Sequence, residues 1–242
     1  MNTSIWTPLI GALMCLHCIV AVSTASDVPR IVIDPQYGGK DRGPISREGK
    51  IGKDIALSIA TRLSQKINKQ RNYHVLLTRN SDVFVPLERR LLTANKDQID
   101  ILISIGVNGS KDINADGLET VVADVVTTDS SFRSTDSKHS SDFATIIKDL
   151  SSTEKSEKSK QLGNLIHSAL VTKTNLKNRG IKFRPLYILL SSPAPSVMVY
   201  PGFLTNPKDA KLLGESSFQD SVAQALLDGV TRYFERPNSD QK

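Results

Sequence analysis

Short β-branched segments alternate with amphipathic helical segments along this chain, and that alternation limits the fold more than any other feature. The run Arg30–Asp34 is rich in Ile and Val and is followed by Pro35 and two glycines, as a buried strand is when a turn ends it. From Asp54 onward, apolar residues recur at helical spacing. Strands and helices that alternate in this way build a largely parallel sheet with helices on its faces.

The alternation continues toward the C-terminus. Further strands are expected at Tyr73–Thr78, Ile101–Ile105, Gly117–Val126, Leu186–Leu190 and Val197–Tyr200. Pro86 is typical of the first turn of a helix, and apolar spacing predicts a last helix over Phe218–Phe234. The sequence therefore predicts an α/β fold with a mixed, mostly parallel sheet of about six strands and helices on both faces.

The N-terminus has the composition of a secretory signal. No charged side chain precedes Asp27, and an apolar run from Pro8 to Val22 is followed by the small residues Ser23, Thr24 and Ala25. The run is shorter than the roughly 20 residues of a membrane-spanning helix. We therefore expect residues 1–25 to be cleaved and the mature chain, without a transmembrane segment, to be exported to a periplasm or outside the cell. A permanent N-terminal anchor is the alternative.

Cysteine usage and charge narrow the chemistry of the mature chain. Cys15 and Cys18 both lie in the expected signal, so no disulfide, thiol nucleophile or thiolate ligand is expected after cleavage. The net charge of +6 then belongs to the mature domain and suits an anionic envelope partner. The basic stretches Lys155–Lys160 and Lys173–Arg184 are broken by polar residues, as in a solvated helix face, so nucleic acid is not expected as a partner.

One segment interrupts the strand and helix pattern. Residues 127–141 are dense in Ser, Thr and Asp, which predicts a loop. Amphipathic helices are expected after it, at Asp142–Leu150 and Glu154–Thr172. The predicted organisation is one domain over residues 27–236, with a Ser/Thr-rich and helical insert at 127–172 and a tail at 237–242.

A series of short motifs resembles one enzyme family. The segments IDPQYGG, KDIALSIATRL, LLTRNSDVFVPLERRLLTAN, LISIGVN, GLETVV, RGIKF and VMVYPGFLTNP occur in this order. The series is similar to that of the zinc-dependent N-acetylmuramoyl-L-alanine amidases, and the likeness runs from Ile31 to Phe234. The insert resembles the added helical region of amidases used in bacterial cell division, in which a helix can occlude the active site.

The resemblance implies a zinc hydrolase, yet its site residues differ here. The family's zinc activates water to cut the amide between the lactyl group of N-acetylmuramic acid and L-alanine, and a glutamate acts as general base. The zinc-ligand positions correspond to Tyr37, Gly52 and Gly106, and the catalytic glutamate position to Tyr200. Glycine offers no ligand, and a phenol with a pKa of about 10 is a poor ligand and base. We therefore expect no zinc cofactor and no catalytic residue.

Other side chains could in principle rebuild a site. His74 lies in the second strand pattern and is expected at an edge or facing solvent. His167 lies in a helix whose apolar residues are expected to pack the other way, and His139 lies in the insert. Glu48 is expected to be a solvated loop acid. None of these residues has the i, i+4 spacing of a metal-binding pair.

The emptied site could instead be a binding groove. Tyr37 and Tyr200 would converge beside the two glycines, and sugar rings stack on such aromatic surfaces. Arg79, Arg90 and Asn108 match family positions near the strand ends, where open α/β sheets bind ligands. The tyrosines could equally be fillers of the space left by the metal. Both interpretations stay open.

Three functions follow for the chain. The first is a catalytically inactive, amidase-like envelope protein that binds peptidoglycan, or that binds and regulates a cell-wall amidase or its activator. The second is an active amidase with a rearranged site built from Glu48 and His74 or His167. The third is a structural envelope protein without glycan binding. The loss of all four site residues favours the first.

Overall fold

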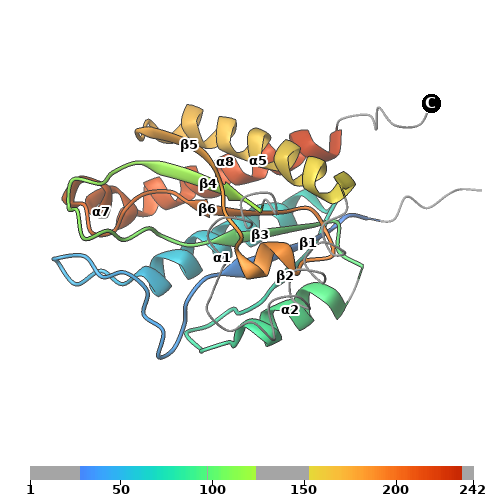
Figure 1. The fold of residues 1–242 in the computed structure, drawn as a ribbon, viewed down its shortest axis with the longest axis horizontal. Coiled ribbons are helices and arrows are strands. Elements are labelled where there is room, and N and C mark those ends of the chain that lie inside the picture. The colour runs from blue at the N-terminus through green and yellow to red at the C-terminus, as the bar shows by residue number, and fades with distance from the viewer. Residues whose placement is uncertain (1–27, 97, 124–152, 236–242) are drawn as a thin grey trace, which may run out of the picture.

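A six-stranded sheet forms the centre of the protein, in the order β2-β1-β3-β6-β4-β5 (Figure 1). The computed structural model describes residues 28–96, 98–123 and 153–235. The strands are β1 (Arg30–Pro35), β2 (His74–Leu77), β3 (Ile101–Ile105), β4 (Leu118–Val122), β5 (Asn178–Phe183) and β6 (Ser196–Tyr200). β4 and β6 pair antiparallel, and the other neighbouring pairs are parallel. The predicted fold class is confirmed.

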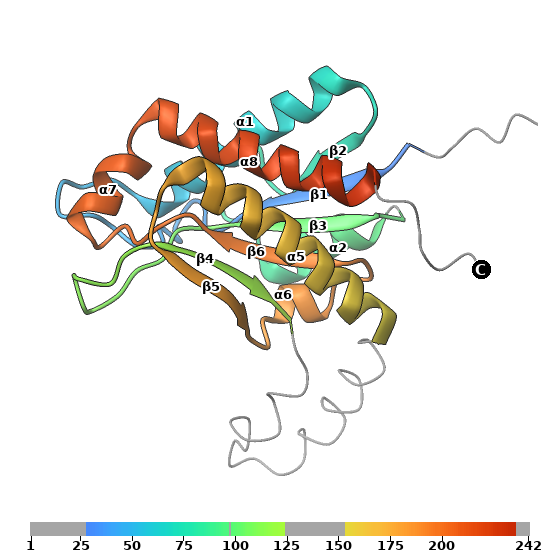
Figure 2. The same cartoon turned by 90° about the horizontal axis from the view of Figure 1, so that it is seen from above.

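Helices cover the two faces of the sheet unequally. The long helices α1 (Gly52–Gln70), α5 (Thr153–Thr174) and α8 (Ser216–Glu235) lie on one face, with α8 between the other two (Figure 2). The shorter helices α2 (Leu87–Lys96) and α6 (Tyr187–Leu190) cover the other face. A further short helix, α7 (Pro207–Leu213), follows β6 at one end of the sheet.

The central strands are buried because both of their faces are covered. In β1, Ile31 and Ile33 pack into the core beneath α1 and α8, whereas Val32 packs toward α2 and α6. This alternation follows from the two-residue period of a strand. The β-branched run of the sequence is therefore a strand between two hydrophobic layers.

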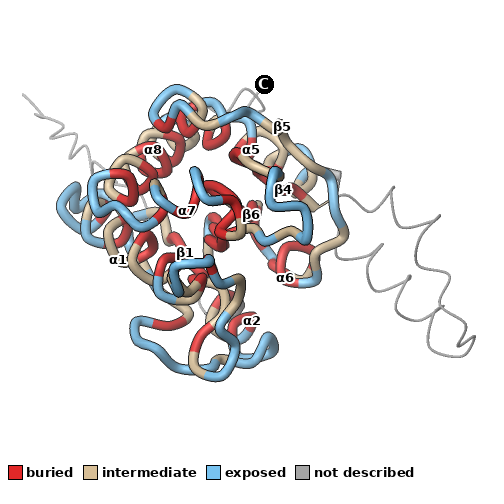
Figure 3. Tube along the Cα trace, turned by 90° about the vertical axis from the view of Figure 1, so that its left-hand side faces the viewer, coloured by how far each residue is buried: buried red, intermediate tan, exposed pale blue. Residues whose placement is uncertain are grey.

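Strand direction determines which ends meet. Because β4 and β6 are antiparallel, the amino ends of β4 and β5 lie at the same edge as the carboxyl ends of β1, β3 and β6. Figure 3 views the molecule from this end, where exposed loops surround buried segments. Ser104, Glu119 and Tyr200 each lie two positions along a strand from a residue that packs toward α2 and α6, so all three lie on that face.

One predicted strand is wrong. Leu186–Leu190 contains a single helical turn, α6, whose residues Ile188, Leu189 and Leu190 are buried against the sheet. A run of apolar residues this short has no period that separates strand from helix. The missing strand is β5, whose charged residues Arg179 and Lys182 suit an edge strand.

The other expected elements agree with the structure to within a few residues at their ends. α5 corresponds to the second helix predicted in the insert, and α8 to the last helix. The sequence pattern missed α7, which Asn206 caps and Pro207 begins. The expected signal segment, the first insert helix and the tail fall outside the described residues. In the part of the chain that is described, no helix is both long and apolar enough to cross a membrane.

Candidate functional site

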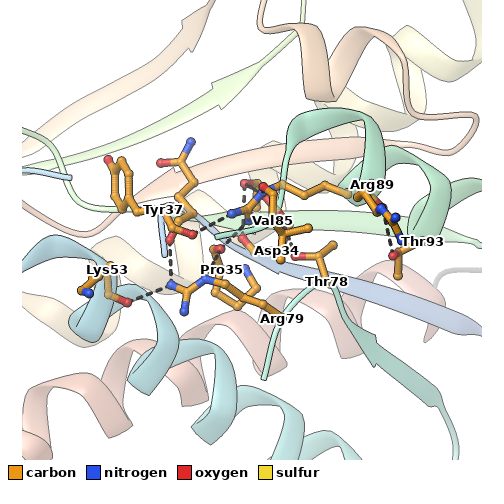
Figure 4. Close-up of polar contacts among 12 residues, drawn as sticks. Asp34, Pro35, Tyr37, Lys53, Thr78, Arg79, Val85, Arg89 and Thr93 are labelled. Atoms are coloured by element: carbon orange, nitrogen blue, oxygen red, sulfur yellow. Dashed lines mark hydrogen bonds and ion pairs between the residues drawn. The ribbon is translucent and has the colours of Figure 1, made fainter. Parts of the chain in front are cut away.

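A buried arginine holds the loop that follows β1. Arg79 Nε donates to the carbonyl oxygen of Pro35 at 3.0 Å (Figure 4). Its Nη2 donates to the carbonyl oxygens of Gln36 at 2.8 Å and Lys53 at 2.9 Å, which ties the loop to the start of α1. Arg79 therefore fixes the backbone that leads into Gln36 and Tyr37.

A second arginine completes this support. Arg90 Nη1 forms an ion pair of 2.7 Å with Asp34 Oδ1, and its Nη2 donates to the carbonyl oxygen of Tyr37 at 2.6 Å. Asp34 also accepts hydrogen bonds from Thr78 and Ser104. The carboxylate is buried, so these charge-assisted contacts compensate its loss of water.

Arg79 and Arg90 lie beneath the loop rather than along an open groove. Their relative exposures are 3% and 7%, and their donors point to backbone carbonyls. They position the loop, and the binding-groove role that the sequence suggested for them does not match this placement. Asn108, the third residue of that set, is half-buried and donates from Nδ2 to Glu119 Oε2 at 3.2 Å.

Tyr37 is held in an unusual backbone conformation. Its φ of 63° lies in the left-handed region, which residues with a side chain rarely adopt. Its hydroxyl donates to the carbonyl oxygen of Val107 at 2.9 Å, and its ring lies so close to Gly43 that a Cβ there would be 2.7 Å away. Burial, together with the neighbouring Tyr200, raises the pKa of Tyr37 well above its ordinary value.

The two glycines that the sequence resemblance assigns to the family's ligand positions are closely packed. A Cβ on Gly52 would lie 2.9 Å from Val107 and 3.0 Å from Pro44. A Cβ on Gly106 would overlap the side-chain oxygen of Gln36 and lie 3.0 Å from the Tyr200 ring. Neighbouring side chains therefore occupy the space that a ligand side chain would need.

Tyr200, the last residue of β6, lies beside Gly106. Burial raises its pKa, while a hydrogen bond with Gln36 and the positive charge of Arg184 act in the opposite direction. The oxygen of the Gln36 amide is buried and has no hydrogen-bond partner among the described residues. The structure thus brings Tyr37 and Tyr200 together beside the two glycines, and both Gln36 and Tyr200 lie against Gly106.

These residues do not fit a zinc ion. Zinc sites in proteins use imidazole, thiolate or carboxylate ligands. The four positions supply two glycines and two neutral phenols, and one phenol is already committed to a backbone carbonyl. Within residues 28–96, 98–123 and 153–235, no group of three His, Cys, Asp or Glu side chains is arranged to hold a metal ion.

The structure does not bring the alternative residues together. Glu48 is exposed in the loop before α1, where a hydrogen bond with Ser46 lowers its pKa. His74 is exposed on the edge strand β2, as expected. His139 lies outside the described residues.

The expected orientation of His167 is wrong. Its ring is buried between α5 and the sheet, with Nδ1 3.0 Å from Thr120 Oγ1 and Nε2 2.8 Å from Asn178 Oδ1. Two polar partners make burial of this imidazole tolerable, so the helix turns it inward together with its apolar residues.

Sequence reasoning missed Glu119 and Gln36. Glu119 is 3% exposed and pairs in register with Tyr200 across β4 and β6. Strand periodicity carried a signal for it, because Glu119 alternates with core residues inside a buried strand. The role of Gln36 had no such signal, since its contact with Gly106 joins residues that are distant in sequence.

The fold is that of solved N-acetylmuramoyl-L-alanine amidases. A family model described as N-acetylmuramoyl-L-alanine amidase matches residues 31–232, and the chain belongs to this family.

Individual relatives agree with that assignment. YqiI of Bacillus subtilis (strain 168), an uncharacterized protein, is 29% identical over 206 residues, which cover 85% of each chain. The amidase AmiA of Escherichia coli (strain K12) is 29% identical over 221 residues, covering 84% of this chain and 75% of AmiA. The crystal structure of an N-acetylmuramoyl-L-alanine amidase from Clostridium difficile 630 superposes with a TM-score of 0.71 at 27% identity, covering 88% of this chain and 100% of that one.

Proposed function

We propose that this protein is a peptidoglycan-binding member of the amidase family that does not hydrolyse the amide by the zinc mechanism. One observation carries the proposal: Gln36 and Tyr200 pack against Gly106 and Tyr37 bonds to Val107, at the positions that the sequence resemblance assigns to the family's zinc ligands and catalytic glutamate. The proposal includes export to the cell envelope, where peptidoglycan lies.

The chemistry of these side chains supports the absence of hydrolysis. A general base works best when its pKa lies near the operating pH. Burial raises the pKa of both tyrosines above the ordinary value of about 10, so both phenols stay neutral at physiological pH. Neither can take a proton from water under these conditions.

The same side chains suit a ligand that is bound and not cut. Tyr37 and Tyr200 are half-buried, and the loop that carries Tyr37 is held rigidly by Arg79 and Arg90. A rigid site with aromatic rings loses little conformational entropy when a sugar or peptide packs against it. A cell-wall amidase or its activator is the other partner that we propose.

Family membership favours the alternative, an active amidase, more strongly than it favours a binding protein, because matched relatives such as AmiA are described as amidases. The geometry of the four positions is what favours binding. An active enzyme would need chemistry outside those positions, and Glu48, His74 and His167 do not converge.

Two assays on the purified mature domain separate these functions. Metal content after dialysis against zinc is measured beside dye release from labelled sacculi, with a zinc-binding family amidase as positive control. We expect no retained zinc, no dye release and co-sedimentation with sacculi. Stoichiometric zinc with dye release would overturn the proposal and establish the amidase. Absence of both hydrolysis and sacculus binding would leave the structural envelope protein.

The co-sedimentation assay with sacculi needs a matched pair of variants. Tyr200→Ala removes a ring from the proposed site, whereas Tyr233→Ala removes a partly buried ring from α8, on the other face of the sheet. We expect Tyr200→Ala to reduce the sedimented fraction and Tyr233→Ala to leave it unchanged. Equal sedimentation of the two variants would place binding elsewhere.

A further inference from the structure

Two arginines of the β5 segment share one buried carboxylate beside Tyr200. Arg179 Nε lies 2.8 Å from Glu119 Oε1, and an Nη atom of Arg184 lies 3.1 Å from Glu119 Oε2. Asn108 donates to the second oxygen as well. Burial alone would raise the pKa of Glu119, but the hydrogen bond from Arg179 and the charge of Arg184 hold it below its ordinary value.

The two guanidinium groups differ in how many of their N–H donors are already hydrogen-bonded within the protein. Arg179 also donates to the carbonyl oxygen of Asp116 and lies over the ring of Phe203, 5.0 Å from its centroid. Arg184 makes one side-chain hydrogen bond within the described residues, and its side chain is 44% exposed. Since a guanidinium carries five N–H donors, Arg184 keeps most of them for a ligand.

The local charge is positive at the rim of the tyrosine site. Two guanidinium charges face the single negative charge of Glu119, so one positive charge is left without a partner in this cluster. Glu119 lies opposite Tyr200 in the sheet, and the charge of Arg184 acts on Tyr200. An anionic group of a ligand in contact with Tyr200 would therefore meet Arg184.

We propose that Arg184 binds a carboxylate of the peptidoglycan stem peptide, with Glu119 and Arg179 as positioning residues. The inference rests on the proposed peptidoglycan binding. A guanidinium and a carboxylate can form two parallel hydrogen bonds, which fixes the orientation of the peptide as well as contributing affinity. Glu119 holds one side of the Arg184 guanidinium and so directs its remaining donors.

The test is a titration of the full mature protein with a soluble muropeptide, followed by calorimetry. Arg184→Gln is compared with Arg232→Gln, which makes the same charge change on the exposed last turn of α8. We expect Arg184→Gln to weaken binding about tenfold, as loss of a charge-assisted hydrogen bond does, and Arg232→Gln to change it less than twofold. Arg184→Lys should fall between the wild type and Arg184→Gln.

A second ligand identifies the charged group. A muropeptide whose carboxylates are converted to amides should bind the wild type about as weakly as Arg184→Gln binds the free acid, and the mutation should then have no further effect. We expect Arg184→Gln to fold, because Glu119 keeps Arg179 and Asn108 as partners. Circular dichroism and the thermal midpoint check this.

The outcomes distinguish the two levels of proposal. If Arg184→Gln and Arg232→Gln bind alike, or if amidation has no effect, the carboxylate site is refuted while peptidoglycan binding stands. If amidation has no effect and a phosphate-rich wall polymer competes, Arg184 takes a phosphate and the assignment to the stem peptide is overturned. If the wild type binds neither muropeptide nor sacculi, both proposals fail.

Discussion

At the scale of single residues, the side chain of Gln36 fits only because position 106 is a glycine. The side-chain oxygen of Gln36 occupies the space where any Cβ at position 106 would lie, and Tyr200 closes the other side. A tightly packed site of this kind tolerates added volume poorly. The absence of a ligand at position 106 and the presence of Gln36 are therefore two parts of one packing arrangement.

Gly106→Ala should destabilise the protein by about 1–3 kcal/mol, because the new methyl group overpacks the site. The measurement is the free energy of unfolding from urea denaturation. Gln36→Ala in the same chain should recover most of the loss, since it removes the overlapping atom. Additive costs of the two substitutions would show that the positions are not coupled.

The three partly buried tyrosines should make stability fall at alkaline pH. Burial raises the pKa of Tyr233 to about 12 and raises the pKa of Tyr37 and Tyr200 as well. The unfolded chain releases these protons at about pH 10. Their contribution is complete below that pH and is lost as the pH rises toward the folded-state values, because the unfolded state then binds fewer protons.

Tyrosinate absorbance and urea denaturation, followed together from neutral to alkaline pH, check this expectation. Ionisation of the buried phenols should coincide with unfolding. Tyr37→Phe should make the decline in stability less steep, because the variant has one such group fewer. An unchanged slope would mean that Tyr37 ionises in the folded protein as readily as in the unfolded chain.

At the scale of elements, α7 connects the loop after β6 to the amino end of β4. Asn206 accepts hydrogen bonds from the backbone N–H groups of Lys208 at 2.9 Å and Asp209 at 3.2 Å. Buried Asp209 in turn accepts from the backbone N–H groups of Gly117 and Phe203. A cap on a two-turn helix thereby stabilises the loop that follows Tyr200.

Asn206→Ala should cost about 1–2 kcal/mol, because it leaves the first N–H groups of α7 without their cap and removes the bond to the carbonyl oxygen of Ile113. Asn114→Ala, in an exposed loop, is the matched control and should change stability by less than about 0.5 kcal/mol. Thermal and urea unfolding measure both. Equal effects would show that the cap contributes nothing specific.

For the whole molecule, the framework around the site holds in place the four positions that the sequence resemblance assigns to the family's zinc and catalytic residues. The sheet order, the two arginines beneath the β1 loop and the capped α7 all position residues 37, 52, 106 and 200. A scaffold of this kind should accept a ligand side chain at position 106 more readily once the overlapping side chain of Gln36 is removed.

The variant Tyr37→His, Gly52→Glu, Gly106→His should bind zinc only weakly while Gln36 remains, because its amide overlaps the side chain at position 106. Adding Gln36→Gly should strengthen zinc binding by about tenfold or more. Zinc affinity is measured by competition with a chelator, after circular dichroism has shown that both variants fold. Equal affinities would mean that Gln36 does not block the site.

Much of the fold could be predicted because its signals are local. Five of the six expected strands match strands of the structure, and the period of the apolar residues in α1 and α8 identified those helices. The error at α6 and the omission of β5 concern a short apolar run and a charged edge strand. Neither has a period that is strong enough to indicate its structure.

For the candidate site, too, some features follow from the sequence and others only from the structure. The sequence by itself determined that positions 52 and 106 offer no side chain and that positions 37 and 200 offer only phenols. Only the tertiary structure decided that Gln36 fills the space beside Gly106, that Arg79 and Arg90 support the loop, and that Arg184 reaches Glu119. The physical reason is that side-chain identity is a property of one position, whereas these contacts join residues brought together by strand order and strand direction.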